Sequence, residues 1–285
     1  MSFKRVGKEI KIGNKKTEVL LLPFLFFIIV FMLIDIKKKR LIFLASYILL
    51  ACLFVYLIKP VYLFSIIIVL VPPTVLNFIW LKKSKTKIFI FSLLTTLLFA
   101  PPVEVVARMA NAWDVQSILP RLLGIAPLEN ILFAFLNFFW VLSFYEYFVD
   151  RDKEEKISKN FKWIIALYLV LLVIVTLLFF LAPELVGLNY HTLSIIILLI
   201  PGALIFYKKP SLLYKTIIPT LFFAFVFFVY EIVSLFIGSW WWPGSYLFPL
   251  NLGGNIFPLD DVIIWYFLST PVLIGGYEFF VDDNK

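Results

Sequence analysis

Residues 258–281 have the sequence PLDDVIIWYFLSTPVLIGGYEFFV, which begins with two acids, becomes apolar and ends on Tyr-Glu-Phe-Phe-Val. Residues 127–149, PLENILFAFLNFFWVLSFYEYFV, repeat this design. Each run is long enough to cross the roughly 30 Å hydrocarbon core of a bilayer as one helix. Both runs carry acids at the same place, inside segments where charge is costly, and this pattern indicates that the acids have a function.

The composition extends this interpretation to the whole chain. Of its 285 residues, 62% are hydrophobic and 15% are charged, and the mean hydropathy is +1.00. These values exclude an ordinary soluble domain and predict an all-α polytopic protein of the lipid bilayer. The net charge of +8 comes from Lys and Arg in short loops between apolar runs, as expected for an oriented membrane protein. We therefore expect no nucleic-acid partner.

About eight or nine apolar runs are candidates for membrane spans. They are residues 19–34, 41–58, 61–81, 88–112, 127–149, 163–181, 191–207, 213–239 and 258–281. Residues 19–34 lack a small-residue cleavage site, so we expect a retained anchor, whether or not this run crosses completely.

The loops predict an orientation. One side carries seventeen Lys and Arg and the other carries two, once the N-terminal tail is set aside. This bias predicts a multi-pass protein of the cell membrane with its basic loops in the cytoplasm. The six basic residues of the tail would then lie outside, against the same rule.

The sequence also contains an internal duplication. Similar residues recur at offsets of 127 to 132, a drift that small loop insertions produce. The matched pairs are Ser65–Ile68 with Ser194–Ile197, Pro72 with Pro201, Glu104 with Glu231, Trp113 with Trp240, Pro127 with Pro258, Glu146 with Glu278, and Asp150 with Asp282.

The duplication divides the chain into four parts. Residues 1–60 form a basic tail with extra helices, 61–149 a first repeat, 150–189 a loop with a linking helix, and 190–285 a second repeat. Two parallel three-helix repeats predict a pseudo-twofold axis along the membrane normal, with a site between the halves.

Glu104 and Glu231 lie within apolar helices, where an ionisable residue is by default a functional one. The alternative is a structural ion pair, and here the two copies differ. Glu104 has Arg108 four residues later on the same helical face, whereas Glu231 has no basic residue at either corresponding position. An isolated carboxyl group in an apolar surrounding favours its neutral, proton-carrying form. We therefore expect Glu104 to be the paired copy and Glu231 the reactive one.

Asp260, Asp261 and Glu129 directly follow the Pro-Leu pairs that start the two acidic runs. Acids in a first helical turn are often no more than N-terminal stabilisation. Asp260 and Asp261 are adjacent, however, and neighbouring carboxyl groups can hold a proton between them because like charges repel. We expect these acids to lie toward the same membrane face as Glu231.

Trp113 and residues 240–242, all Trp, are placed toward that face. They fit either an aromatic belt at the interface or indole faces that stabilise a cation. His191 and Cys52 are single residues of their kinds, so no metal or Cys/His catalytic cluster is expected. Four further acids end the helices on the basic side, where we expect them to be solvated or snorkelling: Glu146, Asp150, Glu278 and Asp282.

In each copy a helix with an internal acid is followed nine residues later by Trp, then by a Gly-containing loop and Pro-x-acid-(acid or Asn). The copies are Glu104…Trp113…Gly124…Pro127-Leu128-Glu129-Asn130 and Glu231…Trp240…Gly254…Pro258-Leu259-Asp260-Asp261. This repeated motif resembles the lycopene cyclase domain, a duplicated or paired membrane unit of bacterial, archaeal and fungal carotenoid pathways. The resemblance covers about residues 61–149 and 190–282, and Asn130 and Asp260 depart from the usual Pro-x-Glu-(Glu/Asp).

The resemblance implies an intramolecular lyase or isomerase that closes the acyclic ends of lycopene into ionone rings, giving γ- or β-carotene. It implies a membrane-dissolved carotenoid substrate and neither a cofactor nor a metal. Glu231 would donate the proton, while Asp260, Asp261, Glu129 and Glu104 would supply or accept protons. The expected substrate-binding residues are Trp113, Trp240, Trp241, Asn130 and Arg108.

Two other functions stay open at this point, and so does the oligomeric state. One is a membrane cyclase for another isoprenoid. The other is a proton-coupled transporter of small molecules or lipids, with Glu104 and Glu231 as its titrating carboxyls.

Overall fold

The computed structural model describes residues 35–152, 156–182 and 194–282. The chain divides into Met1–Ala45, of which Asp35 and the start of one helix are described, and Ser46–Lys285. The arrangement given below is that of the second part. The expected span 19–34 and His191 lie outside the described residues.

Long helices follow one another along the chain. They are α2 (Ile36–Ile58), α3 (Tyr62–Trp80), α4 (Lys85–Met109), α5 (Leu128–Phe144) with the π-helical η1 (Tyr145–Asp150), α6 (Phe161–Leu181), η2 (Ile195–Leu199) with α9 (Ile200–Lys208), α10 (Ser211–Phe236), and α11 (Leu259–Asp261) continuing through η3 (Val262–Leu268) into α12 (Ser269–Phe280). Among the described residues, six segments are long and apolar enough to cross a membrane: 36–58, 62–80, 85–109, 128–150, 211–236 and 259–280. The prediction of an α-helical membrane protein is confirmed.

The ends of α4 and α10 differ from the prediction by three residues. Each helix turns at a residue with positive φ, Asn111 (53°) after α4 and Gly238 (72°) after α10. The next amide then bonds to a carbonyl five residues back, Ala112 to Ala107 and Ser239 to Ser234, both at 2.8 Å. This is a left-handed helix cap, which Gly and Asn adopt readily. Both helices therefore stop before the tryptophans that follow them.

Short antiparallel ribbons, which the sequence analysis did not predict, gather where these helices end. Strand β2 (Arg121–Leu122) pairs with β3 (Ala126–Pro127), and β5 (Pro249–Leu252) pairs with β6 (Asn255–Pro258). Gly253 and Gly254 join the latter pair with φ of 61° and 93°, the conformation that a tight two-residue hairpin requires. A third ribbon pairs β1 (Asp114–Val115) with β4 (Trp240–Trp241).

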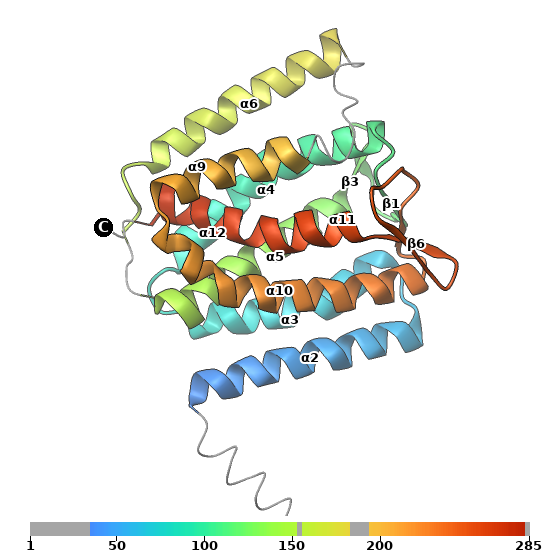
Figure 1. The fold of residues 1–285 in the computed structure, drawn as a ribbon, viewed down its shortest axis with the longest axis horizontal. Coiled ribbons are helices and arrows are strands. Elements are labelled where there is room, and N and C mark those ends of the chain that lie inside the picture. The colour runs from blue at the N-terminus through green and yellow to red at the C-terminus, as the bar shows by residue number, and fades with distance from the viewer. Residues whose placement is uncertain (1–34, 153–155, 183–193, 283–285) are drawn as a thin grey trace, which may run out of the picture. The chain divides into compact units, whose positions relative to one another are not determined.

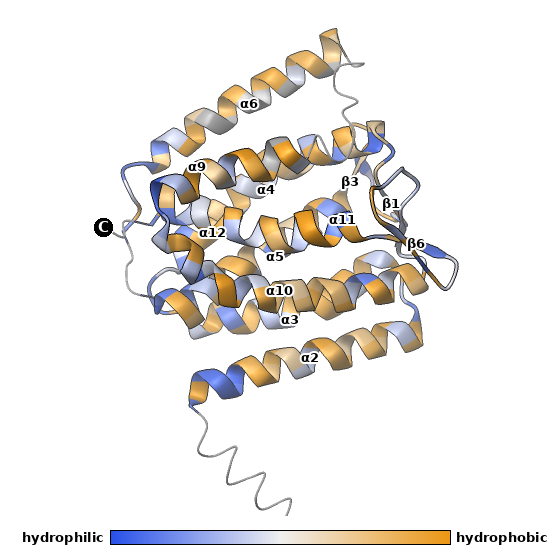
Figure 2. Ribbon diagram, in the orientation of Figure 1, coloured by the Kyte–Doolittle hydropathy of each residue, from blue (hydrophilic) through white to orange (hydrophobic). Residues whose placement is uncertain are grey.

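Helices α3, α4, α5, α10 and α12 run side by side, with the ribbons together at one end of the group (Figure 1). We call this the hairpin end. The other end, which holds Lys82–Lys87, Asp150–Asp152 and Lys215, is the basic end, and Figure 2 shows hydrophilic residues collected there beside the apolar helices. Aromatic packing joins α5 to α10 inside the group: the ring of Phe144 stacks on Phe222 at 4.5 Å, and Trp140 meets Phe223 edge-on at 5.0 Å.

The turn between α3 and α4 is held by one carboxylate from the loop after η1. Asp152 accepts hydrogen bonds from the backbone N–H groups of Lys82 (2.5 Å), Lys83 (3.0 Å) and Ser84 (2.8 Å), at the N-terminus of α4. Partial burial raises the pKa of Asp152, but these bonds and the Ser84 hydroxyl outweigh burial and hold the pKa below its ordinary value. The charged form is therefore the one that stabilises this turn.

We predict that Asp152→Asn lowers the free energy of unfolding at neutral pH by about 1 kcal/mol, the usual size of a lost helix-terminal cap. Because the folded pKa lies below the unfolded value of about 3.9, the stabilisation is complete above that value and is lost as the pH falls through the folded pKa. Unfolding in mild detergent, followed at pH 7 and at acidic pH, should show a difference between wild type and variant that disappears on acidification. Equal stability at pH 7 would contradict this role.

Candidate functional site

A cavity of about 590 Å³ lies among the helices and is lined by residues of both sequence repeats. Among the described residues that line it, the charged ones are Glu104, Glu231 and Asp261. The remaining walls are mostly aliphatic and aromatic. An apolar cavity with a few polar groups at defined positions is the usual form of a small-molecule site.

Glu231 and Asp261 form a carboxyl pair in this cavity. Glu231 lies on α10 and is 2% exposed, and Asp261 lies on α11 and is 4% exposed. Their carboxyl groups interact directly, and Oε1 of Glu231 has no hydrogen-bond partner among the described residues. Buried polar atoms normally have a partner, so this free acceptor position marks a place where a ligand or a water would bind.

Glu104, the corresponding residue of the first repeat, has different neighbours. Its Oε1 accepts a bond from the Trp113 indole Nε1 at 3.3 Å, and the side chain of Asn130 lies beside it. Its Oε2 has no hydrogen-bond partner among the described residues. Glu104 thus meets two groups that can donate a hydrogen bond, Trp113 and Asn130, whereas Glu231 meets one such group, the Trp242 indole, and a second acid, Asp261.

Arg108 is not among the residues that line the cavity, and its ion pair is with Asp114 rather than with Glu104. Arg121 Nη2 approaches the same Asp114 oxygen at 3.4 Å. Partial burial raises the pKa of Asp114, but these guanidinium groups and the Val115 N–H hold it below its ordinary value. The sequence predicted that Arg108 pairs with Glu104 on the same helix, and in the structure it pairs with Asp114 of the hairpin end instead.

Glu129 and Asp260 occupy corresponding positions, and neither is among the residues that line the cavity. Glu129 is fully buried and accepts bonds from the backbone N–H groups of Ile118 and Leu119 and from the Ser117 hydroxyl, all at 2.7 Å. Asp260 accepts a longer bond from the Leu247 N–H at 3.5 Å. In both repeats the first acid after Pro-Leu binds the loop, and the next residue, Asn130 or Asp261, faces the cavity.

Four indoles lie on the cavity walls: Trp113, Trp240, Trp242 and Trp265. Trp113 meets both Trp242 and Trp265 edge-on, at 6.1 Å between ring centroids. Trp241 lies outside the lining and is 44% exposed. The sequence analysis missed Trp265, although it lies one helical turn after Asp261 and the helical period would have placed both on one face.

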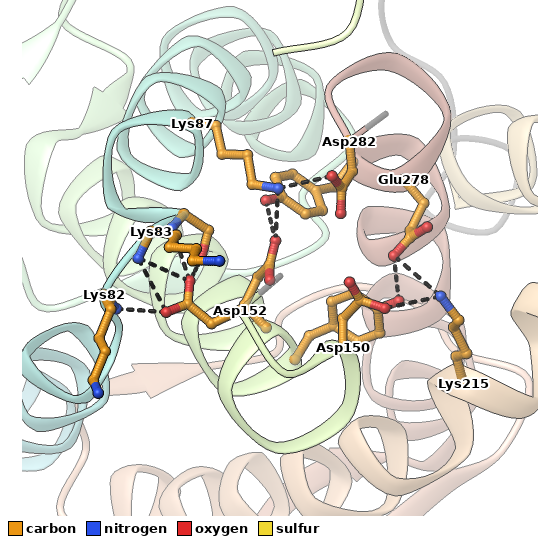
Figure 3. A network of polar contacts seen from close by, with 12 residues as sticks. Lys82, Lys83, Lys87, Asp150, Asp152, Lys215, Glu278 and Asp282 are labelled. Carbon is orange, nitrogen blue, oxygen red and sulfur yellow. Dashed lines mark hydrogen bonds and ion pairs between the residues drawn. The ribbon is translucent and has the colours of Figure 1, made fainter. Parts of the chain in front are cut away.

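The four acids expected to be solvated at the basic end are buried, and this expectation was wrong. Glu146, Asp150, Glu278 and Asp282 are at most 3% exposed. Lys87 binds Asp282 at 2.7 Å and Glu146 at 3.2 Å, and Lys215 binds Asp150 at 2.9 Å and Glu278 at 3.7 Å (Figure 3). Tyr277 donates to Glu146 at 2.5 Å, and Tyr145 donates to Glu278. There, acids and lysines from helices that are far apart in the sequence compensate each other's charges, and the local sequence could not indicate this.

Carboxylate oxygens of Glu146, Asp150 and Asp282 lie within 4.8 Å of one another, as metal ligands would. The ammonium groups of Lys87 and Lys215 already provide cations at these acids, so we interpret the group as an ion-pair network. Cys52 is buried and lies outside the cavity lining, as a packing residue would.

Comparisons with protein-family models, with curated proteins and with solved structures found no match to this chain. The function proposed below therefore rests on the residues of the cavity and their geometry.

We predict that Lys87→Met lowers the free energy of unfolding by about 3–5 kcal/mol, because it leaves Glu146 and Asp282 buried without their cation. The Lys215 side chain is 35% exposed against 1% for Lys87, so Lys215→Met should cost less. Lys82→Met is the control, because the Lys82 side chain is exposed and its bond to Asp152 comes from the backbone N–H, which the substitution keeps. The readouts are the yield of monodisperse protein and its unfolding in mild detergent, and a Lys87→Met variant as stable as Lys82→Met would refute the network's role.

Proposed function

We propose that this protein is a membrane carotenoid cyclase of the lycopene cyclase domain type. Its reaction would convert the acyclic end groups of lycopene to ionone rings. The observation that carries the proposal is the adjacent, buried carboxyl pair of Glu231 and Asp261 in a cavity that also holds Glu104 and is otherwise mainly apolar and aromatic. Such a cavity suits a hydrocarbon substrate that has to be protonated away from water.

The chemistry is an isomerisation. A carboxylic acid adds a proton to the terminal C=C bond, which forms a C–H bond and leaves a tertiary carbocation. The π electrons of a second C=C bond then attack this cation and close a six-membered ring. A base removes one ring proton and restores a C=C bond. One proton enters and one leaves without any exchange of electrons, so the reaction needs no redox cofactor.

The second repeat supplies the acid in this proposal. Two adjacent carboxyl groups repel each other when both are charged, so the pair of Glu231 and Asp261 retains a proton. Glu231 would transfer that proton to the substrate, since its Oε1 has no hydrogen-bond partner in the described part of the chain. Asp261 would keep Glu231 protonated until the transfer, because two neighbouring carboxyl groups resist carrying charge together.

The first repeat supplies the base. Trp113 donates to the Glu104 carboxyl, and Asn130 stands where Asp261 stands in the other copy, so Glu104 shares no proton with a second acid. A carboxylate held by N–H donors can accept the proton that the ring releases. The four indoles on the cavity walls would stabilise a passing cation through the faces of their rings, which attract positive charge.

The proposal includes the finer architecture. Residues 61–149 and 190–285 would form two parallel three-helix repeats related by a pseudo-twofold axis, linked by α6, within about eight or nine spans. Two reciprocal contacts support this symmetry: Asp114 pairs with Trp241, 127 residues later, and the Tyr145–Glu278 bond is mirrored by Tyr277–Glu146. The basic end would face the cytoplasm in the cell membrane.

Expression in cells that accumulate lycopene tests the function directly. We predict the appearance of monocyclic or bicyclic carotene, measured by chromatography of the extracted pigments. Unchanged lycopene alongside well-folded protein in the membrane would reject lycopene as the substrate. That result would leave a cyclase for another isoprenoid or a proton-coupled transporter as the function of the carboxyl groups.

Matched amide substitutions test the roles of the individual acids. Glu231→Gln and Asp261→Asn should each lower the cyclisation rate by about 10²–10⁴-fold, the usual contribution of a general acid. Asp260→Asn is the control, because this neighbour binds a loop outside the cavity, and it should keep nearly full activity. Full activity in Glu231→Gln together with an inactive Glu104→Gln would show that the first repeat carries the acid.

A further inference from the structure

The cavity is long rather than round. Its lining residues recur at every turn along α11, η3 and α12, at positions 261, 265, 269, 273, 276 and 280. A sphere of 590 Å³ would be about 10 Å across, whereas this stripe extends about 28 Å at about 1.5 Å of rise per residue. The cavity therefore runs along nearly the whole of this helix.

Helix α4 contributes a second stripe of lining residues. Its lining residues are Phe91, Thr95, Phe99, Ala100, Val103 and Glu104. Val103 packs in the cluster that includes Trp265, and Phe91 Cζ lies 3.9 Å from a Cβ built on Gly276, so the two helices line the cavity as neighbouring walls over the same length. The charged lining residues lie at the hairpin end, and the charge-free part of the cavity extends toward the basic end.

Gly276 is the smallest residue of this stripe, and it lies in the charge-free part. A Cβ built on it would lie 3.9 Å from Cζ of Phe91, an ordinary van der Waals distance. One methyl group is thus accommodated, while a branched side chain would extend into the cavity toward Phe91. Gly275 has a different role, because its Cβ would lie 2.9 Å from Ile205 Cγ2 and disturb the packing of α12 on α9.

We propose that the cavity receives a linear apolar chain end-on, with the reactive end between the carboxyl groups and the rest extended along α12 past Gly276, whose missing side chain sets the length of chain that fits. The inference depends on the proposed function only in naming a long polyene as the occupant. It makes Gly276 a residue that determines chain-length specificity, without any part in the chemistry.

The test compares Gly276→Leu with Gly276→Ala, using lycopene and linear polyenes that carry the same acyclic end group on progressively shorter chains. Gly276→Leu should lower lycopene turnover about tenfold or more and leave the shortest polyene within about threefold of wild type. Gly276→Ala should resemble wild type with both. The double variant Gly276→Leu/Phe91→Ala, which removes the neighbouring ring, should recover lycopene turnover, and the turnover of the shortest polyene by Gly276→Leu shows that this variant has folded.

Binding gives a second readout that does not need catalysis. Bound polyenes should quench the fluorescence of the four tryptophans that line the cavity near its carboxyl groups. The dependence of this quenching on polyene length should shift in Gly276→Leu. Quenching with the predicted shift but no ring formation would reject the cyclase and keep the tunnel. Equal losses for long and short polyenes in Gly276→Leu, or no loss with either, would overturn the role of Gly276.

Discussion

The arrangement of the helices depends on six charged side chains at the basic end, of which all but Lys215 are buried. Lys87 and Lys215 come from α4 and α10, and their acids come from η1 and from the end of α12. A buried carboxylate without a partner is so unfavourable that each of these acids requires a lysine from another helix at its side. The network thus specifies which helices are neighbours, whereas apolar contacts alone specify this only loosely within a bilayer. At the opposite end, Glu104 and Glu231 each keep one carboxyl oxygen without a hydrogen-bond partner among the described residues, and an occupant of the cavity can bind there.

Sequence reasoning succeeded where the relevant signal was local. The length and apolarity of the runs gave the helices, and the duplicated acid–Trp spacing selected Glu104, Glu231, Trp113 and Trp240, all of which line one cavity. It failed where the partner was remote. Lys87 and Asp282 are 195 residues apart, so no window of sequence could reveal that they compensate each other. The predicted pairing of Arg108 with Glu104 was wrong for a related reason, because Asp114 in the hairpin end binds Arg108 instead.

The structure also separates two acids that the sequence places side by side. Helix geometry rotates successive residues by about 100°, so Asp260 and Asp261 cannot face the same direction. One is directed to the loop and the other to the cavity, and Glu129 and Asn130 are divided in the same way. The adjacency of Asp260 and Asp261 in the sequence was therefore a poor guide to which carboxyl groups act together. The pair that matters, Glu231 with Asp261, joins two different helices.

The difference between Asn130 and Asp261 has a consequence for how such a protein can diversify. The two side chains have nearly the same shape, so exchanging an oxygen for an amide nitrogen leaves the packing of a buried helix start unchanged. Yet the exchange alters whether the neighbouring glutamate meets a hydrogen-bond donor or a second acid. After a gene duplication, one nucleotide change can therefore make two identical halves chemically unequal without a compensating change elsewhere. A symmetric scaffold can acquire a direction for proton flow through a substitution that hardly changes the free energy of folding.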